Sequence, residues 1–96
     1  MHLGIAIKHI RSQRGLTQDE LAKMCGLSRT SISQIETGTK YPQKRNLNTI
    51  CKVLKVPEST IYLYGLEIID VPDSKKELFK DFHPIIKEMI DKLVLV

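Results

Sequence analysis

Apolar residues recur at steps of three and four along the first two thirds of the chain, in short runs that glycines separate. This spacing predicts a helix over about residues 2–14. It also predicts a second helix that Thr17 caps and Gly26 ends, and a third that begins after a Ser28 cap. Glu20 lies three residues after Thr17 and so completes a capping box. Helices this short and this close together are typical of a small helical domain.

Two more helices are predicted beyond a loop that is rich in basic residues. Asn46 is expected to cap the fourth helix, and the Val56–Pro57 pair ends it, because a residue that precedes proline disfavours helix. A short fifth helix then runs to Gly65. Five short helices in about 65 residues predict an all-α fold, with a compact domain over residues 1–66.

The last third of the chain has a different organisation. Residues 67–73 are predicted to form a linker and residues 74–96 a C-terminal helical extension, with Ser74 and Glu77 at the spacing of a second capping box. Pro84 lies inside the extension, where an unbroken helix would lose about 3 kcal/mol. We therefore expect a break or kink at Pro84, which starts a second helical piece.

An apolar stripe with steps of three and four residues runs along this extension. Such a stripe predicts either a dimer interface or a helix that folds back on its own domain, and the fifth helix, with Ile61, Tyr62 and Leu63, is a second possible dimer surface. The dimer-interface candidates are Phe79, Phe82, Ile86, Met89 and Leu93, and Val96 ends the stripe.

The charge of the chain is unevenly distributed. Residues 1–64 contain ten Lys and Arg against four acids, a net charge of +6, whereas residues 65–96 contain five Lys against seven acids, a net charge of −2. A basic domain with a mildly acidic tail indicates a polyanionic partner for the domain and a protein partner for the tail.

Several classes of protein are disfavoured by the residues that are missing. Cys25 and Cys51 lie among apolar residues and are expected to be small buried thiols, and His2, His9 and His83 are expected at the surface without metal-ligand spacing. The chain lacks a nucleophile–base set, a phosphate-binding glycine loop and an acidic cluster. We therefore expect no enzyme, no cofactor and no metal. With no apolar run of membrane-spanning length, we expect a cytoplasmic location.

The stretch from Gln18 to Ile35 is the most informative part of the chain. Ala22 stands where two steeply crossing helices bring their backbones together, and a larger side chain would wedge them apart. Gly26 suits a turn that needs a positive φ. Ile32 anchors the second helix to the core, so that its opposite face can project outward. These three positions predict a helix-turn-helix.

The chain resembles the phage-repressor and Cro type of helix-turn-helix proteins, the XRE family, over about residues 3–65. The similar text is RGLTQDELAKMCGLSRTSISQIETG, followed by YP and NLNTICKVLKV. The resemblance does not extend to the tail. Further positions that fit the family pattern are Glu36, Gly38, Pro42, Leu47, Ile50 and Leu54.

This resemblance implies that the third helix is a recognition helix that enters the major groove of DNA. It also implies an internal ion pair between Arg11 and Glu36. The implied base contacts are Arg29, Thr30, Ser33 and Gln34, of which Arg29 suits a guanine and Gln34 an adenine. The implied phosphate contacts are Gln18, Ser28, Ser31, Arg11, Lys40, Lys44, Arg45 and Asn46.

The function that follows is a transcription regulator, a repressor or controller protein, that binds a palindromic operator in double-stranded DNA as a homodimer. The alternative is a protein-interaction module, such as an antitoxin or a sensor-binding regulator, that uses the C-terminal helix. The basic residues of the motif and of the following loop favour DNA.

Overall fold

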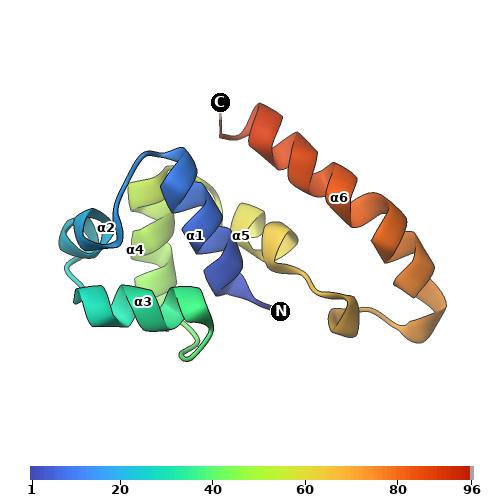
Figure 1. The fold of residues 1–96 in the computed structure, drawn as a ribbon, viewed down its shortest axis with the longest axis horizontal. Helices are drawn as coiled ribbons and strands as arrows, with labels where there is room; N and C mark the ends of the chain where they lie inside the picture. Colours follow the sequence, from blue (N-terminus) through green and yellow to red (C-terminus); the bar gives the residue numbers. More distant parts are fainter. Residues whose placement is uncertain (96) are drawn as a thin grey trace.

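Residues 1–95, which the computed structural model describes, form six α-helices and two short 3-10 turns. Helices α1 to α5 pack together in one body, and α6 lies along one side of it (Figure 1). The predicted all-α fold is confirmed. The elements are α1 (Leu3–Gln13), α2 (Gln18–Cys25), α3 (Arg29–Thr37), α4 (Lys44–Leu54), α5 (Glu58–Gly65), η1 (Ile68–Asp70), η2 (Asp73–Lys75) and α6 (Lys76–Leu93).

Helix α1 crosses the body and packs against both α3 and α5. Its apolar residues Leu3, Ile7 and Ile10 repeat at helical spacing and are buried. Helix α2 packs on α3 and α4, so the α2–α3 pair lies on the side of the body away from α6 (Figure 1). The buried core continues through Leu21, Ala22, Ile32, Ile35, Leu47, Ile50, Leu54 and Ile61.

Gly4 sets the distance between α1 and α3. A Cβ atom at this position would lie 2.0 Å from the carbonyl oxygen of Ile35 and 2.8 Å from that of Glu36. Only glycine, which has no Cβ, allows this backbone approach. The position of α3 is therefore fixed by its backbone contact with α1 as well as by side-chain packing.

The predicted caps of α2 and α3 are confirmed. The Thr17 hydroxyl accepts the N–H of Glu20 at 3.1 Å, and the Glu20 carboxylate accepts the N–H of Thr17 at 2.9 Å. The bond from the Thr17 backbone to the carboxylate is the main cause that holds the pKa of Glu20 below its usual range, and the Thr17 side chain acts in the same direction. Ser28 caps α3 by accepting the N–H of Ser31 at 3.0 Å. Gly26, with a φ of 69°, ends α2 in the left-handed conformation.

The start of α4 differs from the prediction. The helix begins at Lys44, and Gln43 at the cap position makes no side-chain cap hydrogen bond. Asn46 already lies in the first turn, so the predicted Asn46 cap is wrong. Lys44 and Arg45 are good helix formers, and they extend the helix almost back to the buried Pro42.

The segment between α5 and α6 is folded into the turns η1 and η2. Ser74 lies inside η2, and Lys75 occupies the cap position of α6 without a side-chain cap hydrogen bond. The predicted capping box of Ser74 and Glu77 is therefore wrong. A capping residue needs extended backbone, and Ser74 has the helical geometry of the 3-10 turn instead.

Helix α6 is continuous through Pro84, so the predicted break at His83–Pro84 is wrong. The proline is exposed, and the backbone bond that it cannot donate is lost on the solvent side of the helix. His83 and Ile90 on the opposite side are buried and hold the helix against the body on both sides of the proline. Packing energy thus outweighs the local cost of the proline.

One side of α6 packs back on the body. Ile90 and Leu95 join the hydrophobic core, and Ile86 and Val94 pack against it. The end of the predicted stripe, Val96, lies outside the described residues. None of the helices in residues 1–95 combines the length and the apolar character that crossing a bilayer requires.

The histidines are not the plain surface residues that the sequence predicted. His83 is buried, and its Nε2 donates to the carbonyl oxygen of Leu63 in α5 at 2.9 Å. The Nε2 of His9 in α1 lies 2.7 Å from Oδ1 of Asp91 in α6. His2 accepts a backbone N–H at the start of α1. Two of the three histidines therefore join α6 to the body.

Candidate nucleic-acid interface

The turn between α2 and α3 has the geometry that the sequence motif predicted. Gly26 is left-handed, and the N–H of Leu27 returns to the carbonyl oxygen of Ala22 at 2.9 Å. Ala22 and Ile32 are buried at the α2–α3 crossing and in the core below it. This anchoring leaves the outer face of α3 free.

The four candidate base contacts lie together on that outer face. Arg29 and Thr30 are exposed, and Ser33 and Gln34 are half-buried. All four line one shallow hollow, and Gln18 from the first turn of α2 completes it. The structure therefore brings these side chains into a single surface at the N-terminal part of α3. Guanidinium, hydroxyl and amide groups are the groups that hydrogen-bond base edges and phosphates.

A buried ion pair joins this surface to α1. Nε and Nη2 of Arg11 donate to the two carboxylate oxygens of Glu36, at 2.6 and 3.0 Å. The side chains of Arg11 and Glu36 are 11% and 1% exposed. The ion pair that the family resemblance implied is therefore present, and it links α1 to the end of α3.

The candidate phosphate contacts Arg11 and Gln18 are both engaged in this network. Nη1 of Arg11 donates to the carbonyl oxygen of Leu16 at 2.7 Å, and Nε2 of Gln18 donates to Glu36 at 3.0 Å. Three of the five guanidinium N–H groups are thus used inside the protein. The amide of Gln18 keeps a second N–H. Phosphate contact by either residue stays a prediction, made by the remaining N–H groups.

Ser28 and Ser31 lie at the N-terminus of α3, where unpaired N–H groups favour an anion. The hydroxyl of Ser28 donates to that of Ser31 at 2.9 Å while it caps the helix. Ser28 is exposed and Ser31 half-buried. Their hydroxyl groups are placed beside the base-contact candidates Arg29 and Thr30 in the same helical turn.

The other candidate phosphate contacts lie apart from this hollow. Lys40 lines a different hollow, with His2 and Tyr41. Lys44 and Arg45 are exposed in the first turn of α4, and Asn46 beside them is half-buried. These residues form a second basic region after α3, and their contact with phosphate stays a prediction.

Neither cysteine has the chemistry of an activated nucleophile. Burial raises the pKa of the Cys51 thiol to about 11, and the negative charge of Glu58 acts in the same direction. Burial also raises the pKa of Cys25, which is half-buried. Both thiols therefore remain protonated near neutral pH, whereas catalysis needs the thiolate.

A comparison with known protein families shows which family this chain belongs to. Residues 4–66, well over half of the chain, match a family described as a helix-turn-helix domain. The chain belongs to the XRE helix-turn-helix family. The matched segment covers α1 to α5, and α6 lies outside it. The family resemblance inferred from the sequence is thus confirmed, and DNA binding and transcription regulation come with the family.

Three relatives illustrate the range of this XRE family. The chain is 31% identical, over 71% of its length and 76% of the relative's, to an ImmF control region 10 kDa protein of Bacillus phage phi105. It is 32% identical to the HTH-type transcriptional activator BcrR of Enterococcus faecalis, over 78% of its own length and 36% of the relative's. It is 38% identical to antitoxin HipB of Escherichia coli, over 64% and 66% of the two chains. The chain thus spans only about a third of the activator.

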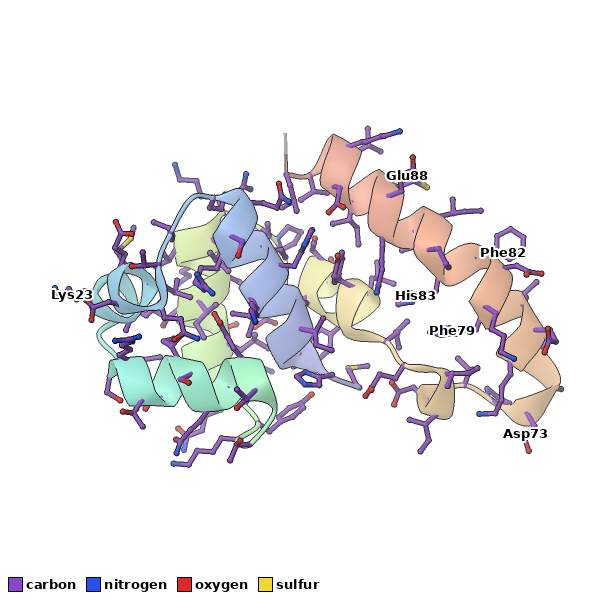
Figure 2. The ribbon with its side chains drawn as sticks, viewed as in Figure 1. Lys23, Asp73, Phe79, Phe82, His83 and Glu88 are labelled. Atoms are coloured by element: carbon purple, nitrogen blue, oxygen red, sulfur yellow. The ribbon has the colours of Figure 1, made fainter. Side chains whose placement is uncertain are left out.

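In this XRE protein, the residues of the predicted dimer interface lie on two different sides of α6. Phe79 and Ile86 are half-buried, and the ring of Phe79 stacks on His83 at 4.5 Å. Figure 2 shows Phe79 and His83 on the side of α6 that faces the body and Phe82 on the opposite side. The residues that stay at least half exposed are Phe82, Met89 and Leu93, and the last two line an apolar hollow with Leu63 of α5.

Sequence reasoning missed the polar contacts that hold α6 on the body. They involve His9 of α1, Arg14 at the C-terminal cap of α1, and Asp91 near the end of α6. The spacing between the partners exceeds 75 residues, so no local pattern could reveal them. Only the apolar stripe indicated that one side of α6 would be buried.

Proposed function

We propose that this protein is a sequence-specific transcription regulator that reads an operator with α3 in the major groove of DNA. The observation that carries the proposal is the gathering of Arg29, Thr30, Ser33 and Gln34 with Gln18 around one hollow on the free face of α3. The net charge of +6 on residues 1–64 supports a polyanionic partner. Phosphate contacts from the α3 N-terminus and from Lys40, Lys44, Arg45 and Asn46 would orient the protein on the duplex.

We further propose that the operator is palindromic and that the protein binds it as a dimer. One recognition helix reads only half of such a site, and two half-sites about 34 Å apart need two copies related by a twofold axis. The outward face of α6, with Phe82, Met89 and Leu93, is the proposed contact between the copies. Helix α6 and helix α3 lie on different sides of the body (Figure 1), so pairing through α6 would leave α3 free.

A second candidate function is a protein-interaction module that uses the same α6 face. Two observations favour it: the exposed apolar side chains of α6, and the relatives named as antitoxins, such as HipB. The two functions do not exclude each other, because α3 and α6 lie on different sides of the body (Figure 1). They differ in whether a second copy of this chain or a different protein covers α6.

Selection of bound sequences from a random duplex library, followed by salt titration of the preferred sequence, tests the proposal. We expect a palindrome and a log–log salt slope of about −0.9 for each phosphate that the protein neutralises. Weak binding without a preferred sequence would contradict operator recognition and favour the protein-interaction function.

Arg29→Ala is expected to relax the sequence preference at one base pair of each half-site. The loss of a bidentate contact to guanine costs about 1–3 kcal/mol at that base pair and nothing at others. The measurement is the dissociation constant for a set of operators, each with one base pair changed. Lys80→Ala, which removes one exposed positive charge from α6, is the matched control and should leave the preference unchanged. An equal loss on every sequence would show that Arg29 contacts phosphate only.

Met89→Asp is expected to convert the proposed dimer to a monomer. A carboxylate placed in an apolar interface without a partner costs several kcal/mol, enough to raise the dimer dissociation constant by at least about 100-fold. Sedimentation velocity of the free protein measures this change. Met24→Asp is the matched control, because Met24 is 58% exposed on α2 and Met89 is 52% exposed on α6. If Met89→Asp leaves a dimer intact, the interface lies elsewhere, and α5 becomes the next candidate.

A further inference from the structure

Helix α1 contacts both the recognition helix and the tail helix. Arg11 pairs with Glu36 at the end of α3, and Arg14, three residues further along the chain, is the C-terminal cap residue of α1. The guanidinium of Arg14 reaches the last residues of the described tail, and His9, on the preceding turn, reaches Asp91. The element that anchors α3 is therefore also the element that holds α6.

Arg14 serves the C-terminal ends of two helices at once. Its Nε donates to the carbonyl oxygen of Leu54 in α4 at 2.9 Å, and its Nη2 lies 3.4 Å from that of Lys55. Its Nη atoms lie 3.5 Å from the carbonyl oxygens of Val94 and Leu95 after α6. Unpaired carbonyl groups make a helix C-terminus negative, so one cation between two such ends attracts both. This contact holds the end of α6 near the end of α4.

His9 adds a second and shorter contact. Its Nε2 lies 2.7 Å from Asp91, and its ring stacks on the ring of Tyr64 in α5 with centroids 4.7 Å apart. The Nζ of Lys87 in α6 lies 5.0 Å from the centroid of the same Tyr64 ring. His83 contacts α5 further towards the start of α6. A continuous helix that is held at two separate places has a fixed direction relative to the body.

We propose that His9 and Arg14 are positioning residues that fix the direction of α6 relative to α3 and so determine which half-site spacing the dimer accepts. This inference rests on the proposed function, since it requires a dimer that pairs through α6. Each base pair added between half-sites moves one of them by about 3.4 Å and turns it by about 35° around the duplex. A dimer whose recognition helices are rigidly attached to the pairing helices cannot follow that movement.

The test uses the selected operator and versions with one or two base pairs inserted between its half-sites. For the wild-type chain, we expect the affinity to fall at least about tenfold for each inserted base pair. Asp91→Ala removes the carboxylate that contacts His9. Because Asp91 lies in α6, no residue of the body is changed. We expect the affinity of this variant to fall only about threefold for each inserted base pair, and its affinity for an isolated half-site to stay unchanged. Asp81→Ala, an exposed carboxylate on the same helix, should behave as the wild type.

Arg14→Ala is the second variant, and Arg14→Lys should restore part of the spacing preference because it keeps the positive charge. Since Arg14 also holds the end of α4, Asp91→Ala decides the matter if Arg14→Ala does not fold. If the wild type and Asp91→Ala lose the same affinity on the operators with inserted base pairs, the inference is overturned, but operator binding by a dimer is not. A wild-type protein that stays monomeric on its operator would overturn both.

Discussion

Arg11→Ala is expected to lower the free energy of unfolding by about 3–5 kcal/mol, the usual effect of removing one partner from a buried ion pair. Glu36 would keep its carboxylate in the protein interior, where its side chain is 1% exposed, with only the amide of Gln18 as a hydrogen-bond partner. The carbonyl oxygen of Leu16 would lose its donor as well. Urea denaturation followed by circular dichroism measures the change.

A double-mutant cycle separates the energy of the ion pair from the cost of leaving the buried carboxylate of Glu36 unpaired. Glu36→Gln keeps the shape of the side chain without its charge, so Arg11→Ala in the Glu36→Gln background should cost much less than in the wild type. Lys8→Ala is a matched control, because Lys8 is an exposed cation on α1. A cost for Arg11→Ala below about 1 kcal/mol, as for a surface pair, would contradict a buried role for this interaction.

Gly4→Ala is expected to destabilise the protein by about 3 kcal/mol or more, at the upper end of the cost of overpacking. The new methyl group would meet the carbonyl oxygen of Ile35 at 2.0 Å, and a backbone atom cannot turn aside as a flexible side chain can. Alanine has a helix propensity about 1 kcal/mol better than that of glycine, which offsets only part of the clash. Thermal and urea denaturation measure the net loss.

We expect Gly4→Ala to change DNA binding as well as stability. Relief of the clash requires α3 to move away from α1, and this moves the proposed base-contact residues relative to the rest of the body. Ser12→Ala, at an exposed position of α1, is the control and should change stability by less than about 0.5 kcal/mol. If Gly4→Ala were as stable as Ser12→Ala, the close approach of α1 and α3 would not constrain the fold.

The features that the sequence predicted correctly are those that local chemistry determines. The Thr17–Glu20 capping box and the Ser28 cap each involve residues three positions apart, and Gly26 supplies a conformation that other residues adopt at a cost. The helix-turn-helix could be recognised because its constraints fall within one short stretch. The clustering of Arg29, Thr30, Ser33 and Gln34 followed directly from helical spacing.

The features that the sequence did not predict depend on contacts between distant residues. Pro84 stays inside a helix because His83 and Ile90 pack on the body, and this packing is not visible in the proline's own neighbourhood. The significance of Gly4 depends on α3, which lies more than 20 residues away. The apolar stripe of α6 was visible, but its spacing alone could not indicate which of its residues would face the body.

The division of α6 into an inward and an outward side has a consequence for how gene control would respond to protein level. Because Ile90 and Leu95 lie in the hydrophobic core of their own chain, each copy fills its core with its own tail. Obligate dimers, by contrast, often have no stable folded monomer. If two folded monomers assemble on each operator, occupancy at low concentration rises with the square of the monomer concentration. Halving the number of molecules in the cell would then reduce occupancy about fourfold, which gives a sharper response than a single-copy binder can produce.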